Sequence, residues 1–145
     1  MDSKILIEIA TEADIEEILK LQTQIYRTEK IADGAKTALA KQLKDETCEV
    51  LVAKINDQVL ATAVLYYIGV AIRSSHYALL EGLVVNKSQR GKGIGTEFFK
   101  KCIETAKAKG CYKIIFTSGS DRTDAHKFYE KNGFTKWGLE FRMDL

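Results

Sequence analysis

The sequence is poor in cysteine, and the spacing of the few cysteines excludes two kinds of stabilised scaffold. Cys48, Cys102 and Cys111 are far apart and include no C-x-x-C pair. An odd number of isolated cysteines favours neither a disulfide framework nor a zinc site, so we expect reduced core thiols and no bound metal. Neither His76 nor His126 adjoins a cysteine, so the sequence does not indicate a catalytic thiolate.

An excess of one charge and long apolar runs are also missing. The chain has 22 Lys and Arg against 20 Asp and Glu, a net charge of +2 at pH 7. Neither nucleic acid nor a membrane surface is therefore indicated as a partner. The longest apolar run, Val59 to Ile72, is interrupted by Thr62 and Gly69 and is too short to span a bilayer. No charged and then apolar leader opens the chain, so we expect a cytoplasmic protein.

One glycine-rich stretch stands out between an apolar strand, Leu79 to Val85, and a helical pattern that begins at Ile94. The first turn of a helix has unpaired backbone N–H groups and the positive end of the helix dipole. Arg90 and Lys92 add positive charge at this turn. The stretch therefore predicts a phosphate site, and a pyrophosphate fits its several donors.

Two common phosphate motifs do not fit this stretch. Gly91, Gly93 and Gly95 have the spacing G-x-G-x-G, whereas the dinucleotide fingerprint requires G-x-G-x-x-G. No glycine is followed at the P-loop spacing by Gly-Lys-Ser or Gly-Lys-Thr. The ligand is therefore expected to be neither a dinucleotide nor a nucleoside triphosphate held by these motifs.

The segment Arg90 to Gly95 does fit the pattern Q/R-x-x-G-x-G/A of the GNAT N-acetyltransferase superfamily. Glu81 to Val85 resembles the strand that leads into that loop, and Ala125 to Phe134 resembles the second family signature. The sequence is therefore identified as similar to a small single-domain GNAT member. The resemblance covers the whole chain in its order of elements, with recognisable motifs only between Glu81 and Phe134.

Together the pattern and the resemblance predict one domain over residues 1–145 with an α+β fold (α/β/α layered). We expect a mixed, mostly antiparallel sheet of about six or seven strands, one central parallel βαβ unit and about four helices. The expected strands are Ile5 to Ala10, Cys48 to Ile55, Gln58 to Ile68, Leu79 to Val85, Lys113 to Thr117, Phe134 to Trp137 and Leu139 to Leu145.

Helix ends and turns carry their own signals. Thr11 and Asp14 predict a capped helix start, and a second helix is expected from about Asp33 to Lys44. Asn56 and Asp57 predict a tight hairpin. Either Ser120 or Asp121 is expected to cap the last helix, which Asn132 and Gly133 should end.

The resemblance also implies the binding residues for acetyl-coenzyme A. The loop and first helical turn would hold the pyrophosphate, largely through backbone N–H groups: Arg90, Gly91, Lys92, Gly93, Ile94, Gly95 and Thr96. Leu83, Val84 and Val85 would line the pantetheine arm, with Phe128 contributing from the last helix. A backbone N–H near Val84 would face the thioester carbonyl.

Glu81 and Tyr129 are the catalytic candidates. Glu81 is the only carboxylate on an apolar strand, where it could accept the proton of the acceptor amine through water, point to solvent or pair with a base. Tyr129 has the position of the family's thiolate-protonating tyrosine, and the alternative for it is a role as a core residue. Tyr26 is a candidate acceptor contact or a core residue, and Arg122 replaces an asparagine that is frequent in the family.

The implied function is transfer of acetyl from acetyl-coenzyme A to a primary amine of a small molecule, by direct attack in a ternary complex. Two alternatives remain at this point, a peptide or protein amine as acceptor and a non-catalytic acyl-coenzyme A-binding module. A homodimer is also expected, because the closing strands from Phe134 to Leu145 would form an edge that a second copy could cover.

Overall fold

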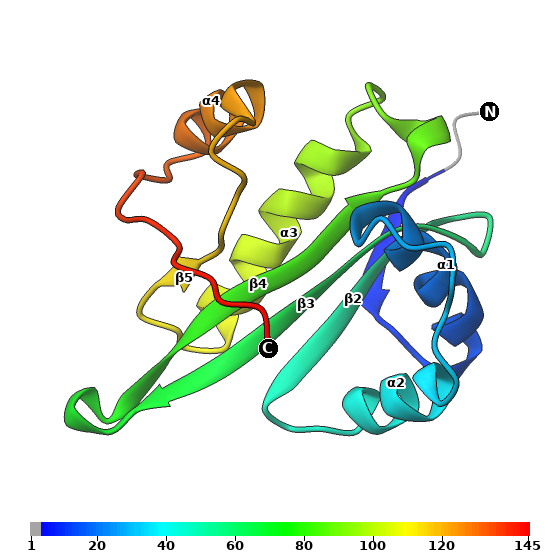
Figure 1. Ribbon diagram of the computed structural model, residues 1–145, viewed down its shortest axis with the longest axis horizontal. Coiled ribbons are helices and arrows are strands. Elements are labelled where there is room, and N and C mark those ends of the chain that lie inside the picture. Colours follow the sequence, from blue (N-terminus) through cyan, green and yellow to red (C-terminus); the bar gives the residue numbers. More distant parts are fainter. Residues whose placement is uncertain (1–3) are drawn as a thin grey trace. The chain divides into compact units, whose positions relative to one another are not determined.

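The computed structural model describes residues 4–145, which divide into two compact units, one ending at Ile115 and the other beginning at Phe116. The first unit contains a mixed sheet of five strands in the order β1-β2-β3-β4-β5 (Figure 1). These strands are β1 (Leu6–Ile9), β2 (Cys48–Ile55), β3 (Gln58–Val70), β4 (Ser75–Val85) and β5 (Ile114–Ile115). The first four are antiparallel neighbours, and β5 runs parallel to β4.

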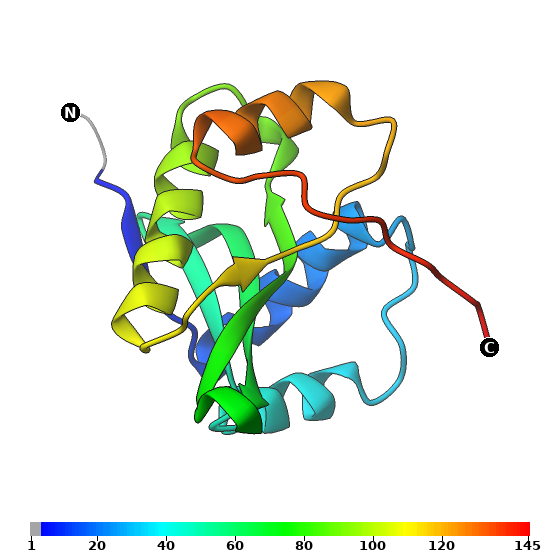
Figure 2. The same ribbon diagram turned by 90° about the vertical axis from the view of Figure 1, so that its left-hand side faces the viewer.

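Helices cover both faces of this sheet. The helices α1 (Ile15–Ile25) and α2 (Ala35–Leu43) lie on one face, and α3 (Ile94–Ala108) lies on the other (Figure 2). Short 3-10 turns occupy Glu12–Asp14, Ala71–Arg73 and Lys87–Gln89. The layered α+β fold and the parallel βαβ unit formed by β4, α3 and β5 are therefore confirmed.

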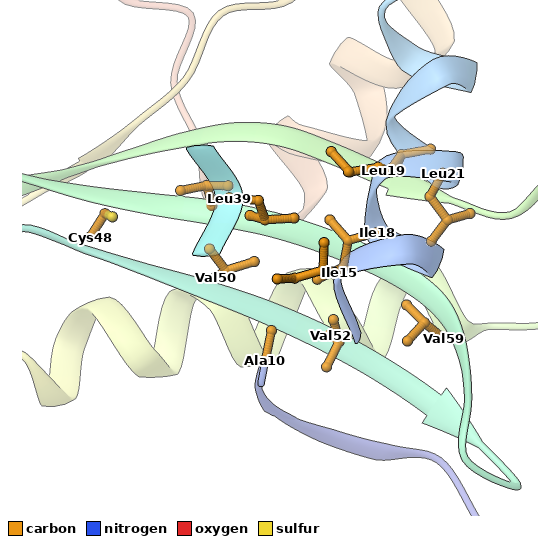
Figure 3. Close-up of a cluster of buried hydrophobic side chains, with 12 residues drawn as sticks. Ala10, Ile15, Ile18, Leu19, Leu21, Leu39, Cys48, Val50, Val52 and Val59 are labelled. Carbon is orange, nitrogen blue, oxygen red and sulfur yellow. The ribbon is translucent and has the colours of Figure 1, made fainter. Parts of the chain in front are cut away.

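Each face of the sheet has its own apolar core. On the α1 and α2 side, Ile18 and Leu39 meet Val50, Val52 and their neighbours in one buried cluster (Figure 3). On the α3 side, Phe98, Phe99 and Cys102 are fully buried. Phe98 and Cys102 belong to the helical pattern that begins at Ile94, so the packing of α3 explains that pattern.

The predicted turn chemistry is confirmed in the first unit. Asn56 and Asp57 join β2 to β3 with φ of 51° and 63°, the left-handed conformation that a tight hairpin requires. At the start of the first helical segment, the Thr11 N–H donates to the Asp14 carboxylate over 2.9 Å, and the Asp14 N–H donates to the Thr11 carbonyl over 2.9 Å. This reciprocal bonding satisfies donors that would otherwise lack partners.

The second unit contains α4 (Thr123–Lys131). As predicted, it ends at Asn132 and Gly133, where Gly133 has φ 93°. The Phe134 N–H donates back to the Tyr129 carbonyl over 3.1 Å, a bond typical of helix C-termini. The predicted cap was wrong, because Arg122 occupies the N-cap position and makes no side-chain capping bond.

The closing strands Phe134 to Trp137 and Leu139 to Leu145 were also wrong for this chain, since no residue from 134 to 145 is in a strand. The described strands number five rather than six or seven, and the parallel pair lies at the end of the sheet. The strand β5 is limited to two residues, shorter than the predicted Lys113 to Thr117. A strand needs a neighbouring strand for its backbone groups, and none of the five described strands pairs with residues 135–145.

No helix within residues 4–145 is both long and apolar enough to cross a membrane.

Candidate active site

A β-bulge in β4 sets the direction of Glu81. Val64 of β3 pairs with Glu81 and Thr62 pairs with Val84, so the register shifts by one residue between them. Gly82 lies in the bulge with φ 63°, a backbone conformation that glycine adopts at little cost. Because cross-strand partners share a face, the bulge places both Glu81 and Val84 on the α1 side of the sheet.

Just before the bulge, after Leu79, β4 separates from its parallel neighbour. The two strands pair only at Ala78 with Ile114 and at Leu79 with Ile115. No other strand of the first unit pairs on that side of β4, so within this unit its edge from Glu81 to Val85 has backbone groups that an extended ligand could bond. Polar amides in a ligand could bond this edge as an added strand would.

The glycine loop leads from this edge into α3. Gly91 and Gly93 have φ of 81° and 83°, and a Cβ added to either would meet nothing within 4 Å. Glycine is therefore needed at these positions for its backbone conformation and not because a side chain would clash, and the space beside each Cα is open. The first described bond of the helix runs from the Glu97 N–H to the Gly93 carbonyl over 3.2 Å. The N–H groups of the first turn, at residues 94–96, precede it and point toward the loop.

Contacts from α1 and from the loop itself hold this turn in place. The side-chain carbonyl of Gln24 accepts the Lys87 N–H over 3.3 Å, and the Asn86 side chain accepts the Ser88 N–H over 3.1 Å. The Arg90 Nε donates to the Val85 carbonyl over 3.3 Å. The Arg90 Nε thus anchors the loop to the end of β4. The side chain is exposed, so its positive charge lies near the start of α3.

The predicted cofactor residues divide by exposure. Arg90, Gly91, Lys92 and Gly93 are exposed, whereas Leu83, Val85, Gly95 and Thr96 are half-buried. The side chains of Val84 and Ile94 are buried in the core, so only their backbone atoms could reach a ligand. A Cβ at Gly95 would lie 3.6 Å from Val85 Cγ2, which shows that α3 starts close to the end of β4.

Tyr26 joins Glu81 in the first unit. Its hydroxyl would lie 3.3 Å from a Cβ built on Gly82, and the residue, at the end of α1, is exposed. Burial raises the pKa of the Tyr26 phenol, and the negative charge of Glu81 and the neighbouring Tyr66 raise it further. The phenol therefore stays protonated beside the carboxylate. The carboxylate can accept a hydrogen bond from an ammonium or hydroxyl group of a ligand, and the phenol can donate one to a hydroxyl oxygen.

The second unit holds Tyr129 and Phe128 on α4. The Tyr129 ring packs edge to face on Phe116, with ring centroids 4.6 Å apart, and lies 5.9 Å from the Phe128 ring. Both side chains are half-buried. Their roles toward acetyl-coenzyme A remain predictions.

Some of these residues escaped sequence reasoning. The anchoring roles of Gln24 and Asn86 were not predicted, although an Asn side chain commonly accepts a hydrogen bond from the backbone N–H two residues further on in a turn. The bulge at Gly82 had a clearer signal, because an isolated glycine inside a strand pattern often marks a bulge. The contact between Tyr26 and Gly82 joins distant parts of the chain and has no local signal.

Comparisons with known proteins agree with this geometry. The model of the family described as "Acetyltransferase (GNAT) family" matches residues 12–134. Glucosamine 6-phosphate N-acetyltransferase of Trypanosoma brucei brucei is 38% identical over 66 residues, 46% of this chain and 43% of the relative. The match thus spans less than half of the length of this curated relative.

Solved structures match over nearly the whole chain. One from Agrobacterium tumefaciens str. C58 has a TM-score of 0.88 at 26% identity, covering 97% of this chain and 99% of that chain. The glucosamine-6-phosphate N-acetyltransferase of Arabidopsis thaliana has a TM-score of 0.83 at 18% identity, covering 97% and 98%. The second likeness shows the shared fold.

Proposed function

Because the chain belongs to the GNAT acetyltransferase family, we propose that it is an N-acetyltransferase that uses acetyl-coenzyme A and acts on a primary amine of a small molecule. The observation that carries this proposal is the course of β4. The strand bulges at Gly82, leaves β5 after Leu79 and runs into the positive-φ glycines that precede α3. An open strand edge that ends at a helix N-terminus suits a long ligand with amides at one end and phosphates at the other.

The residues present fit acetyl-coenzyme A. The first-turn N–H groups of α3 and the charges of Arg90 and Lys92 would bind the pyrophosphate, and the β4 edge from Leu83 to Val85 would bind the pantetheine amides. Bound acetyl-coenzyme A supplies the activated thioester carbonyl. The chain supplies binding, orientation and a hydrogen-bond donor, with the Val84 N–H as the candidate donor to that carbonyl oxygen.

Glu81 and Tyr26 are proposed to bind the acceptor amine. Most primary amines are protonated at neutral pH, and an amine can attack a carbonyl only after it loses that proton. Glu81 would take the proton through water, and the Tyr26 hydroxyl would orient the acceptor. Curated relatives named for glucosamine 6-phosphate support a small acceptor.

The first experiment asks whether the protein binds and uses the cofactor. Acetyl-coenzyme A should raise the melting temperature by mass action, whereas pantetheine, which lacks the pyrophosphate, should not. Thiol release should then be measured with glucosamine 6-phosphate, glucosamine, polyamines, amino acids and a lysine peptide. We expect the highest kcat/KM for a small amine. Highest activity with the peptide would contradict the acceptor class, and binding without thiol release for any acceptor would indicate a non-catalytic module.

A variant at Glu81 tests the proton acceptor. With the best acceptor, Glu81→Gln should lower kcat at least about tenfold and remove the acid limb of the pH-rate profile. The matched control is Glu104→Gln, which removes an exposed carboxylate from α3 and should leave the profile unchanged. An unaltered profile in Glu81→Gln would make Glu81 a structural residue.

A further inference from the structure

Two positively charged side chains lie against one tyrosine ring, near the turn from β3 to β4 and the start of β5. The Arg73 Cζ is 4.6 Å and the Lys113 Nζ 5.5 Å from the centroid of the Tyr112 ring. The Lys113 Nζ is also 4.8 Å from the centroid of the Tyr77 ring, and the two tyrosine rings meet edge to face with centroids 6.2 Å apart. These four residues, called the cationic cluster below, all belong to the first unit.

Backbone bonds to β4 fix the position of the cationic cluster. The Tyr112 N–H donates to the His76 carbonyl over 3.1 Å, and the Ala78 N–H donates to the Lys113 carbonyl over 3.0 Å. Arg73 is the last residue of the 3-10 turn that joins β3 to β4. The two cations are therefore attached to hydrogen-bonded backbone, and their contacts with the aromatic rings orient the side chains.

The two cations of the cluster have no acidic partner within the described part of the chain. None of the ion pairs found among residues 4–145 includes Arg73 or Lys113. Like charges this close together repel each other, and an anion bound between them would remove that repulsion. Guanidinium and ammonium groups both bind carboxylates and phosphates, so the cluster suits an acidic group of a ligand.

The cationic cluster reaches the same face of the sheet as Glu81. The pairing of β4 with β3 is regular up to Glu81 and shifts only after it, so Tyr77, Leu79 and Glu81 point to one side. Tyr66, the β3 partner of Leu79, accepts a hydrogen bond from Gln42 of α2 over 2.7 Å. This face is therefore the one that α1 and α2 cover, where the acceptor amine is proposed to bind.

The spacing along this face fits a ligand with a charge at each end. Tyr77 and Glu81 are four positions apart in β4, which corresponds to about 13 Å. Leu79 lies between them and is half-buried, and its partner on β5 is Ile115. A ligand that follows this path meets a carboxylate first, then apolar side chains, and then the two cations of the cluster.

We propose that the cationic cluster binds the acidic end of the acceptor, so that the substrate is a small primary amine with a carboxylate or phosphate roughly 10–13 Å from its amine. This inference rests on the proposed function, because it assigns the far end of an acceptor whose amine lies at Glu81. The cluster is remote from the reacting atoms. A contact of that kind acts on substrate binding, so it lowers KM more than it raises kcat.

Matched acceptors test this substrate class. In ω-aminooctanoate the amine and the acid are far apart, octylamine has the same chain without the acid, and γ-aminobutanoate is too short to reach both ends. The kcat/KM of ω-aminooctanoate should exceed that of octylamine at least about fivefold, mainly through KM, and high salt should reduce this advantage. γ-Aminobutanoate should have no advantage over butylamine. Equal values for ω-aminooctanoate and octylamine would overturn the proposal.

A phosphate arm identifies the acid. The ω-aminooctyl phosphate is measured beside ω-aminooctanoate, and the acceptor with the lower KM shows which acid the cluster prefers. Both KM values should be lower than that of octylamine. If neither is lower, the cluster binds no acid and the proposal is wrong.

Charge reversal tests the residues themselves. The double variant Arg73→Glu with Lys113→Glu should reverse the preference, so that the diamine of the same chain length becomes a better acceptor than ω-aminooctanoate. A purely structural cluster would not change the order of acceptors. Lys107→Glu is the matched control, because it reverses an exposed charge on α3 and should keep the wild-type order. If the double variant does not fold, Lys113→Gln alone should raise the KM of ω-aminooctanoate at least about threefold. The wild-type order in the folded double variant, or an unchanged KM in Lys113→Gln, would contradict the assignment.

Binding without acetyl-coenzyme A separates this inference from the proposed function. In an NMR titration, ω-aminooctanoate should shift the backbone amide signals of both Glu81 and Lys113, whereas octylamine should not shift that of Lys113. These shifts without thiol release for any acceptor would contradict the proposed function and support the acid site. Thiol release with no response at Lys113 would support the proposed function and overturn the acid site.

Discussion

Gly82 determines which way the side chains of Glu81 and Val84 point. Its left-handed backbone conformation accommodates one extra residue in β4, as a bulge, without ending the strand. The bulge turns Glu81 to the same face as Val84, and the missing side chain leaves room for the Tyr26 hydroxyl 3.3 Å from the Cβ position. An alanine here would carry both the strain of φ 63° and a close contact with the phenol. The location of the candidate acceptor site therefore depends on a residue that has no chemistry of its own.

The predicted role of Tyr129 as a proton donor can be tested with a single substitution. Its O–H can donate a proton to a departing thiolate sulfur, which gives the thiol; the neighbouring Phe128 cannot do this. Tyr129→Phe removes one oxygen and leaves the ring packed on Phe116. We expect kcat to fall at least about tenfold, since positioned general acids contribute about a hundredfold or more.

Cofactor affinity and melting temperature should change little in Tyr129→Phe, because the oxygen acts mainly in the transition state. Tyr112→Phe is the control, since it also removes one phenolic oxygen from a partly exposed tyrosine. Full activity in Tyr129→Phe would return Tyr129 to a packing role.

Local sequence signals identified the candidate site residues, but they did not identify the residues that contact and position them. The glycine loop, Glu81 and Tyr129 could be singled out because each departs from its local pattern or fits a spacing. The bond from Gln24 to the Lys87 N–H joins residues far apart in sequence, so it depends on how α1 packs over the sheet. Such contacts follow from the tertiary fold and leave no periodicity to detect.

The glycines at the two ends of α3 allow effects on stability to be distinguished from effects on cofactor binding. It begins beside Gly93 and is followed by Gly110, with φ of 83° and 81°, and a Cβ at either glycine would meet nothing within 4 Å. An alanine at either position carries the same backbone strain of about 1–2 kcal/mol. Only Gly93 lies where the pyrophosphate is proposed to approach the backbone.

We therefore expect Gly93→Ala and Gly110→Ala to lower the free energy of unfolding by similar amounts. Gly93→Ala should also raise the dissociation constant of acetyl-coenzyme A at least about tenfold, because a Cβ blocks close approach of the phosphate to the N–H groups. Gly110→Ala should leave that constant unchanged. Urea denaturation and calorimetric titration measure the two quantities, and equal cofactor affinity in both variants would disprove the loop assignment.

Elements with strong local patterns were predicted accurately, and elements that depend on pairing were not. The bounds of β2 agree with the prediction from Cys48 to Ile55, and α3 begins at Ile94 as expected. Residues 134–145 have an equally clear strand pattern but form no strand in the single chain. Alternation indicates which face a strand would bury, and it does not say which chain supplies the neighbouring strand.

Several buried or half-buried ionisable groups of the chain respond to pH in the same direction. Burial raises the pKa of the thiols of Cys48 and Cys111 and raises the pKa of Cys102 to about 12. Burial, then the hydrogen bond to Glu49, raises the pKa of Tyr67. The hydrogen bond to Asp14 raises the pKa of the Lys54 ammonium. Folding favours the protonated form of each of these groups. Deprotonation at alkaline pH should therefore lower the free energy of unfolding.

Among the thiols, Cys102 should contribute to this effect over the widest pH range, because its pKa is raised to about 12. Its folded pKa of about 12 lies above the unfolded value of about 8.5, so its stabilisation is complete below about pH 8.5 and is lost as the pH rises toward the folded pKa. Over that window the free energy of unfolding should fall by up to about 1.4 kcal/mol per pH unit. Urea denaturation at about pH 7.5 and about pH 10 measures the fall, and Cys102→Ala should reduce it. Val64→Ala, which shortens a buried side chain without a titrating group, should destabilise the protein and keep the full fall. An equally steep fall in Cys102→Ala would place the alkaline sensitivity on other groups.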